Sequence, residues 1–253
     1  MTSVGTYLYG FALSGFRPAP ELRGLAGAPL GVLSHGEVSA VVSRHPVMPL
    51  APSRKNLEPH HRIVREISAQ APLVPAAFGH ICESDGQLLG VMRGHHQEIR
   101  EEVTRLAHKC EMGLKLVWNV DNIFELMVRT NRELRDLRDR VFSRRQPSVA
   151  EKLDVGALFE ATLNQERERL SAVVLDALRP VTCEVNSVPP RDEKTVFQTA
   201  LLIHRAQQTE FLQRLEAAAR AFDASYTLQT TGPWPAYSFV RLRLQASPDG
   251  TRS

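Results

Sequence analysis

The stretch that decides the fold is residues 92–120, MRGHHQEIREEVTRLAHKCEMGLKLVWNV. The spacing between its apolar residues changes from a helical to a strand-like period about two thirds of the way along. The first part carries a stripe at alternating spacings of four and three, which is typical of one face of an α-helix. The stripe consists of Met92, His96, Ile99, Val103, Leu106 and Cys110. The last part, Leu114–Val120, alternates with period two, as a β-strand does. The sequence therefore predicts one long helix over about residues 87–109, followed directly by a strand.

The residues before this stretch predict a sheet with helices packed on it. Residues 7–13 alternate with period two, and residues 30–42 form two apolar runs around Ser34–Gly36, which is typical of a β-hairpin. Residues 60–71 have one apolar helical face, and Pro72 ends that helix. This mixture favours an α+β domain in a ferredoxin-like arrangement, with helices on one face of one sheet. The strand order does not follow from the sequence.

The residues after it predict a second α+β domain that begins with a helical hairpin. Apolar residues recur at heptad spacing over 123–141, and a second helix is expected over 149–178 after a Pro-containing loop. The later elements are expected at 181–185 (strand), 197–203 (strand), 211–222 (helix), 226–230 (strand) and 240–244 (strand). We interpret this order as a modified ferredoxin-like domain with a long helical hairpin. The predicted domains are residues 1–120 and 121–253.

Composition excludes several classes of protein. The chain has 253 residues, 43% of them hydrophobic and 23% charged, so it is neither disordered nor of low complexity. A formal net charge of +3 does not require a nucleic-acid partner. The three cysteines, Cys82, Cys110 and Cys183, form no C-x-x-C pair and favour reduced thiols. Without a signal-peptide pattern or an apolar run of ~20 residues, we expect a soluble cytoplasmic protein with no membrane partner.

No catalytic or cofactor motif is present in the sequence. The glycine patterns that bind phosphates, the Gly-x-Ser-x-Gly elbow and the His-Glu-x-x-His zinc motif are all missing. The best metal candidates are the segment His80–Asp85 and the pairs His60–His61 and His95–His96. Adjacent residues on a helix point about 100° apart, so neither pair chelates a metal easily. We therefore expect no metal and no cofactor, and we interpret His96 as a core histidine bonded to the backbone.

One predicted helix is rich in arginine on its outer face. Acidic residues are interleaved with the arginines between Arg129 and Asp139, which is typical of a solvated face with pairs at i,i+3 and i,i+4. Binding of single-stranded nucleic acid would favour aromatic residues among the arginines, for stacking on the bases, and none lies there. If this helix binds a partner, an acidic protein surface is the expected target. Arg132 and Arg135 are therefore kept as candidate partner-binding residues.

The strongest local signal is Thr231–Phe239, TGPWPAYSF. Two prolines flank Trp234 and restrict its backbone to extended conformations, and Gly232 permits a backbone angle that other residues resist. A rigid aromatic turn without a nucleophile or an acid suits packing or docking and not catalysis. Trp234, Tyr237 and Phe239 are therefore candidate structural or partner-binding residues. For Trp234 we favour packing inside the protein.

This turn resembles a segment of the gas vesicle protein F/L family, in which Gly-Pro-Trp-Pro-Pro-Tyr-Ser-Phe is usual and Ala236 stands for one proline. Three other segments resemble that family in the same order along the chain. They are Tyr7–Gly10, Leu73–Gly79 and Glu111–Lys115, the last with Met112 where the family usually has Trp. The likeness therefore spans the whole chain.

The resemblance implies an accessory protein of gas vesicle assembly, located in the cytoplasm at the gas vesicle, and not an enzyme. Gas vesicles are hollow protein shells built mainly from a small, very apolar subunit. Family F/L proteins are minor components that contact this subunit during assembly, so the implied partners are the main shell protein and other gas vesicle accessory proteins. The resemblance also implies two α+β domains. From the residues alone, a small-molecule sensor or enzyme on a ferredoxin-like scaffold stays open as an alternative.

Overall fold

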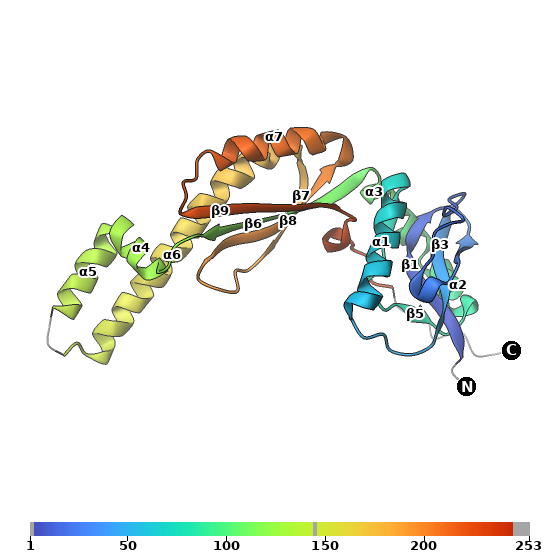
Figure 1. Ribbon diagram of the computed structural model, residues 1–253, viewed down its shortest axis with the longest axis horizontal. Helices are drawn as coiled ribbons and strands as arrows, with labels where there is room; N and C mark the ends of the chain where they lie inside the picture. Colours follow the sequence, from blue (N-terminus) through green and yellow to red (C-terminus); the bar gives the residue numbers. More distant parts are fainter. Residues whose placement is uncertain (1–2, 144–145, 245–253) are drawn as a thin grey trace. The chain divides into compact units, whose positions relative to one another are not determined.

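The computed structural model describes residues 3–143 and 146–244 (Figure 1). Contacts divide the chain into two compact units. The first unit combines the residues up to Glu111 with the segment from Gly232 onward, and the second unit is Met112–Thr231. This division differs from the predicted boundary between residues 120 and 121. The physical reason is that the chain passes twice between the units, so that each unit includes residues assigned to the other by a single boundary.

The first unit is built on an antiparallel sheet in the order β2-β3-β1-β4, with β5 also paired to β1. The strands are β1 (Val4–Leu13), β2 (Leu30–His35), β3 (Val38–Pro46), β4 (Leu73–Pro75) and β5 (Ile81–Cys82). The predicted β2–β3 hairpin is confirmed, and Gly36 in its turn has a φ of 55°. Neither β4 nor β5 was predicted, because two or three residues are too few to show an alternation.

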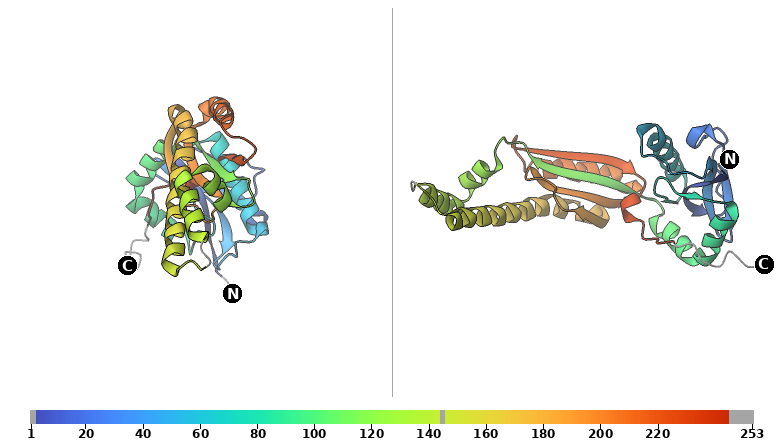
Figure 2. Two further views of the ribbon diagram at one scale, coloured as in Figure 1. Left: turned by 90° about the vertical axis from the view of Figure 1, so that its left-hand side faces the viewer. Right: turned by 90° about the horizontal axis from the view of Figure 1, so that it is seen from below.

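Helices cover both faces of this sheet, as the views in Figure 2 show. Tyr7 and Tyr9 of β1 pack in one cluster with Ile63 of the first helix. On the opposite face, Thr6 donates a hydrogen bond to Asp85 at the start of the second helix. The prediction of helices on one face is therefore wrong, because β1 is buried at eight consecutive positions. The helices of this unit are α1 (Arg54–Gln70), α2 (Asp85–Gly94) and α3 (His96–Leu106).

The single helix predicted over residues 87–109 is two helices, α2 and α3. His95 separates them with φ −121° and ψ 22°, and it follows Gly94, whose residue type has low helix propensity. The apolar stripe continues across the break, because Met92 and Ile99 are both buried. Cys110 is buried as well, but it lies in the next strand and not in the helix.

The second unit has a four-stranded sheet in the order β7-β8-β6-β9. Its elements are β6 (Lys109–Trp118), β7 (Thr182–Val188), β8 (Thr195–His204), α7 (Gln208–Ala219) and β9 (Tyr226–Trp234). Helices lie between β6 and β7 and between β8 and β9, so the chain order is the β-α-β-β-α-β of ferredoxin-like folds. The predicted fold class, two α+β units with a helical hairpin in the second, is confirmed. In the first unit, β2 follows β1 with no α-helix between them.

The strand predicted over residues 240–244 is absent, and β9 is the last strand of the described chain. Val240, Leu242 and Leu244 are half-buried, which explains their alternation with arginines. The backbone N–H of Arg241 donates to the Glu102 carboxylate at 2.7 Å instead of to a neighbouring strand. The alternation of apolar residues and arginines therefore marks a segment that packs on the first unit without joining its sheet.

The predicted helical hairpin is present, but its first arm is two helices. Asn131 interrupts the helix with φ −109° and ψ 117°, and its side chain caps the following helix by accepting from the backbone N–H of Leu134 at 2.9 Å. The second arm matches the predicted bounds and begins with a capping box of Ser148 and Glu151. Figure 1 shows this long helix extending past the sheet with the first arm beside it. The helices are α4 (Ile123–Thr130), α5 (Arg132–Phe142) and α6 (Val149–Leu178).

Across residues 3–143 and 146–244, no helix combines the length and the apolar character that crossing a bilayer requires.

Candidate partner-binding site

The aromatic turn Thr231–Phe239 lies at the end of β9 and closes with the 3-10 turn η4 (Tyr237–Phe239). Gly232 has a φ of 118°, which residues with a side chain rarely adopt, so the glycine is required as predicted. Phe239 is 5% exposed, whereas Trp234 is 43% exposed. The prediction that Trp234 packs inside the protein is therefore wrong for much of its ring. The two residues that follow it, Pro235 and Ala236, take the buried positions.

Two charged side chains of the first unit hold the turn in place by hydrogen bonds. Glu111 accepts hydrogen bonds from the backbone N–H of Ser238 and from its hydroxyl, both at 2.8 Å. Arg105 donates from Nη2 to the carbonyl oxygen of Phe239. Charge-assisted hydrogen bonds are stronger than neutral ones, so they hold the turn in one position. Glu111 also links two segments, Glu111–Lys115 and the turn, that the sequence connects only by resemblance.

A buried carboxylate supports the same segment. Glu102 is 6% exposed and accepts from Arg105 Nε and Nη2 at 2.8 Å each, and from the backbone N–H of Arg241 at 2.7 Å. Burial raises the pKa of Glu102, but the hydrogen bonds and charge of Arg105 and Arg241 outweigh it, so that the pKa lies below its usual value. Glu102 is therefore ionised at neutral pH and keeps Arg105 directed at the turn.

Beneath the turn, His60 is fully buried between two tyrosines. Its Nδ1 lies 2.8 Å from the Tyr7 hydroxyl and its Nε2 lies 3.3 Å from the Tyr237 hydroxyl. Burial, with a smaller effect of neighbouring His61, lowers the pKa of His60 to about 4. The imidazole is therefore neutral at neutral pH, and the Tyr7 oxygen that it meets also accepts from the backbone N–H of Gly79 at 3.1 Å. Tyr237 is therefore held by hydrogen bonding, which the sequence did not reveal.

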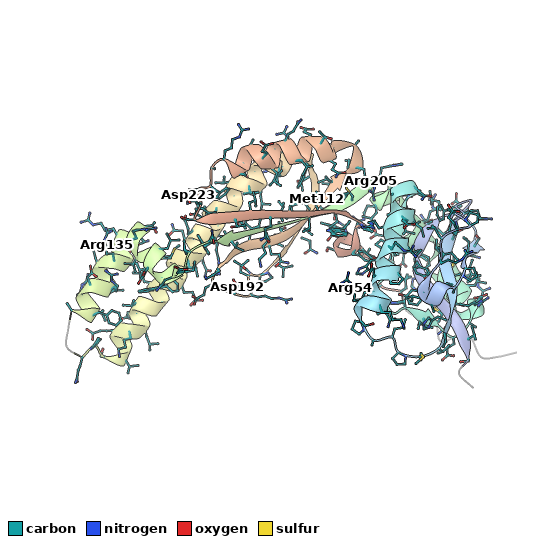
Figure 3. All side chains as sticks on the ribbon, viewed as in Figure 1. Arg54, Met112, Arg135, Asp192, Arg205 and Asp223 are labelled. Atoms are coloured by element: carbon teal, nitrogen blue, oxygen red, sulfur yellow. The ribbon has the colours of Figure 1, made fainter. Side chains whose placement is uncertain are left out.

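Trp234 forms one wall of an open groove of about 510 Å³ on the surface of α1. The groove, here called the Trp234 groove, is lined by Arg54, Leu57, Glu58, His61, Arg62, Arg65 and Trp234. Figure 3 marks Arg54 at the first turn of α1. The α1 residues of the groove recur at spacings of three and four, so they share one exposed face of the helix.

The groove carries an excess of positive charge. Arg54 lies 3.5 Å from Glu58, and Arg62 donates to the carbonyl oxygen of Arg23 at 3.1 Å. The side chain of Arg65 has no hydrogen-bond or ion-pair partner among residues 3–143 and 146–244. Three guanidinium groups against one carboxylate leave two positive charges beside the exposed indole. The arrangement can therefore attract an anionic group and cover an apolar one.

The basic face of α1 is not among the predicted sites, because the helix was expected to begin near His60. The helix begins at Arg54 instead and contains Pro59. Proline is unfavourable in a helix interior, so Pro59 favours a later start in the sequence. The recurrence of Arg54, Glu58, His61 and Arg65 at helical spacing is the signal that would have revealed this face.

The candidate residues Arg132 and Arg135 lie on α5 in the second unit (Figure 3). Arg132 is exposed, with Nε 3.6 Å from Asp136, and Arg135 donates to the carbonyl oxygen of Arg129 at 3.4 Å. These contacts agree with the predicted solvated face. The two arginines belong to a different unit from Trp234, and their role in partner binding stays a prediction.

The histidines and acids considered as metal ligands make other contacts. Asp85 accepts from Arg44 Nη1 at 2.8 Å and from Nη2 at 2.7 Å, which holds the pKa of Asp85 below its usual value. His96 accepts from the backbone N–H of Glu37 at 3.2 Å, as expected, but it is half-buried and not in the core. Within the described part of the chain, no three His, Cys, Asp or Glu side chains gather as a metal site requires.

Replacing Trp234 with alanine is expected to cost about 1–2 kcal/mol of unfolding free energy, less than the roughly 3–5 kcal/mol of a fully buried Trp, because the side chain is already 43% exposed. Urea unfolding of Trp234→Ala measures this, with Phe239→Ala as the buried comparison from the same turn. Equal losses in the two variants would show that Trp234 is as much a core residue as Phe239.

Comparison with known proteins identifies the family. The family model described as gas vesicle synthesis protein GvpL/GvpF matches residues 5–241. Gas vesicle protein F of a Streptomyces strain is 27% identical over 242 residues, which cover 94% of this chain and 100% of that protein. Gas vesicle protein F of Dolichospermum flosaquae is 23% identical, with 95% and 99% covered.

Solved structures show the same fold. The crystal structure of GvpF from Anabaena gives a TM-score of 0.84 at 24% identity, covering 95% of this chain and 100% of that one. The structure of GvpF from Microcystis aeruginosa gives 0.81 at 23% identity, covering 94% and 99%. Since the family match extends over nearly the whole chain and includes the segment that ends in the aromatic turn, this protein belongs to the gas vesicle synthesis protein GvpL/GvpF family.

Proposed function

We propose that this protein is an accessory protein of gas vesicle assembly that binds the main shell subunit and performs no catalysis. Its family supports a role in the gas vesicle system. The observation that carries the finer proposal is Trp234, a residue that is 43% exposed although Glu111 and Arg105 hold its turn in place by hydrogen bonds. An ordered but exposed Trp loses little conformational entropy on binding, and Trp and Arg supply much of the binding energy at protein interfaces.

The assembly role has a physical rationale. A small, very apolar subunit with exposed strand edges aggregates readily before it is built into a shell. A partner that covers the apolar surface of this subunit keeps it available for assembly. We place this activity in the cytoplasm, at the growing vesicle, with other gas vesicle accessory proteins as further partners and with neither nucleic acid nor membrane.

Pull-down of the purified shell subunit by the full-length protein tests this proposal. We expect capture by the wild-type chain and loss of capture by Trp234→Ala, because the variant removes the exposed ring. The double variant Arg132→Ala/Arg135→Ala tests the other candidate surface and is expected to retain capture. Deletion of the gene is expected to reduce buoyant, light-scattering vesicles. Normal vesicle number and shape after deletion, or no capture by the wild-type chain, would contradict the proposal.

One observation favours a second function, that of a small-molecule sensor. The first unit contains a cavity of about 480 Å³ between β1, α2 and residues 240–244. Its volume lies in the range of small-molecule sites, and apolar side chains such as Leu8 line it together with His80 and Gln87. A metabolite screen by thermal shift tests this function. A rise in Tm with one compound that is lost in Val91→Trp, which fills the cavity, would support it.

A further inference from the structure

The length of the Trp234 groove is set by α1. Its lining runs from Arg54 to Arg65, which are eleven residues apart on the helix. At 1.5 Å per residue this is about 16 Å, the length of roughly five residues of extended chain. The groove therefore has the dimensions of a short peptide segment, and it is open along the surface of α1.

The groove combines charged and apolar groups. The guanidinium groups of Arg62 and Arg65 suit carboxylates because they donate two parallel hydrogen bonds. The half-buried Leu57 and the exposed Trp234 offer an apolar contact. The ring of His61, also in the lining, lies 5.9 Å from the ring of Tyr237 in the turn.

We propose that the Trp234 groove binds an acidic segment of a partner protein, with a bulky apolar side chain of that segment against Trp234. The charge complementarity is direct, because the groove carries three guanidinium groups, one of them without a partner in the described chain, and a single carboxylate. The inference rests on the proposed function for the role of this groove in partner binding, and it adds the chemistry of the partner.

The aromatic content of the groove favours a peptide over a nucleic acid. Trp234 is the only aromatic ring among the lining residues apart from the His61 imidazole, whereas single-strand binders stack successive bases on several rings. A peptide with one apolar residue between carboxylates matches a groove that offers one indole ring and three guanidinium groups.

The test is fluorescence anisotropy of fluorescein-labelled EDEFEDE with the full-length protein at low salt. We expect saturable binding that weakens as salt is added, because exposed charges are screened. The peptide KRKFKRK is expected not to bind, and EDEGEDE is expected to bind about fivefold more weakly because it lacks the apolar side chain. Equal binding of the acidic and basic peptides, or no binding of EDEFEDE, would overturn the inference.

Variants of exposed residues locate the site. Arg62→Glu/Arg65→Glu and, separately, Trp234→Ala are expected to weaken EDEFEDE binding about tenfold or more, while Trp234→Phe keeps a ring and restores most of it. The matched control is Arg93→Glu/Arg191→Glu, two exposed arginines outside the groove, which makes the same change in net charge and is expected to stay within about twofold of wild type. An equal loss in the control would show that bulk charge, and not the groove, binds the peptide. Tighter binding of a single-stranded thymidine oligomer at the same residues would identify nucleic acid as the ligand instead.

The two proposals fail separately. Binding of EDEFEDE in the groove without capture of the shell subunit would leave the groove chemistry standing and would contradict the proposed function. Capture of the shell subunit that Arg62→Glu/Arg65→Glu leaves unchanged would support the function and overturn the acidic-segment inference.

Discussion

Lowering the pH from about 6.5 to about 4 is expected to remove about 3 kcal/mol of unfolding free energy from the first unit, through His60. In the folded chain the pKa of His60 is about 4, mainly because the ring is buried, whereas its ordinary value is 6.5. Between these two values the unfolded chain binds a proton that the folded chain does not, so acid favours unfolding. Each pH unit of the difference contributes about 1.4 kcal/mol. The stability due to neutral His60 is complete above pH 6.5 and is lost by pH 4.

The structural cause is the surroundings of the ring. The groups that face His60 are the hydroxyls of Tyr7 and Tyr237, the rings of Tyr9, His61 and Phe78, and the backbone of Ala76, and none of them carries a negative charge. Burial raises the pKa of the three tyrosines, so they remain neutral over this pH range. A protonated His60 would therefore be buried without a counter-ion, which is unfavourable.

Urea unfolding at a series of pH values measures this effect, followed by the fluorescence of Trp234 in a Trp118→Phe background. His60→Gln keeps a neutral hydrogen-bonding side chain but has no proton to gain, and it serves as the control. We expect the variant to be less stable at neutral pH and to show a much flatter pH dependence between 6.5 and 4. If wild type and His60→Gln lose stability with the same slope, acid acts through other groups and not through His60.

Replacing Leu134 with alanine is expected to cost about 2–5 kcal/mol of unfolding free energy in the second unit. Leu134 lies at 0% exposure on α5, which contacts α6. Truncation removes its buried methyl groups and leaves a cavity that the surrounding helices fill only partly. Ile123, Met127 and Val141 of the same apolar stripe are also buried, so the helical hairpin has little room to compensate.

Arg135→Ala is the matched control, because it removes the side chain next to Leu134 in the chain. Among residues 3–143 and 146–244, its guanidinium reaches only the carbonyl oxygen of Arg129, at 3.4 Å, so we expect a change within about 0.5 kcal/mol. Thermal and urea unfolding compare the two variants. Unchanged stability of Leu134→Ala together with loss of shell-subunit capture would identify the stripe as a docking surface.

Much of the fold was predictable because local periodicity is set by neighbours in the chain. The bounds of α6 follow from its apolar residues and from Ser148, which begins the capping box. The helices that were wrongly joined, α2 with α3 and α4 with α5, keep their apolar stripe across a single non-helical residue. His95 and Asn131 have non-helical backbone angles but do not interrupt the spacing of the apolar residues, and a pattern of side chains alone does not reveal such a break.

The candidate site was predictable only in part. The aromatic turn and its glycine follow from proline and glycine chemistry, and Gly232 has the expected positive φ. The burial of the turn does not follow, because it depends on Glu111 and His60, which are 127 and 177 positions away from their partners Ser238 and Tyr237. Those contacts hold the second half of the segment, which contains Tyr237 and Ser238, against the first unit and leave Trp234 exposed.

The sequence by itself determined the α+β class, the helical hairpin, the β2–β3 hairpin and the resemblance that the family match confirms. Each of these rests on spacing or on side chains within a short stretch. Only the tertiary structure decided that β9 is the edge strand beside β6 in the second sheet, that His60 is buried and that Trp234 borders a basic groove on α1. The physical reason is that periodicity identifies residues that share a face, whereas burial depends on what distant part of the chain packs against that face.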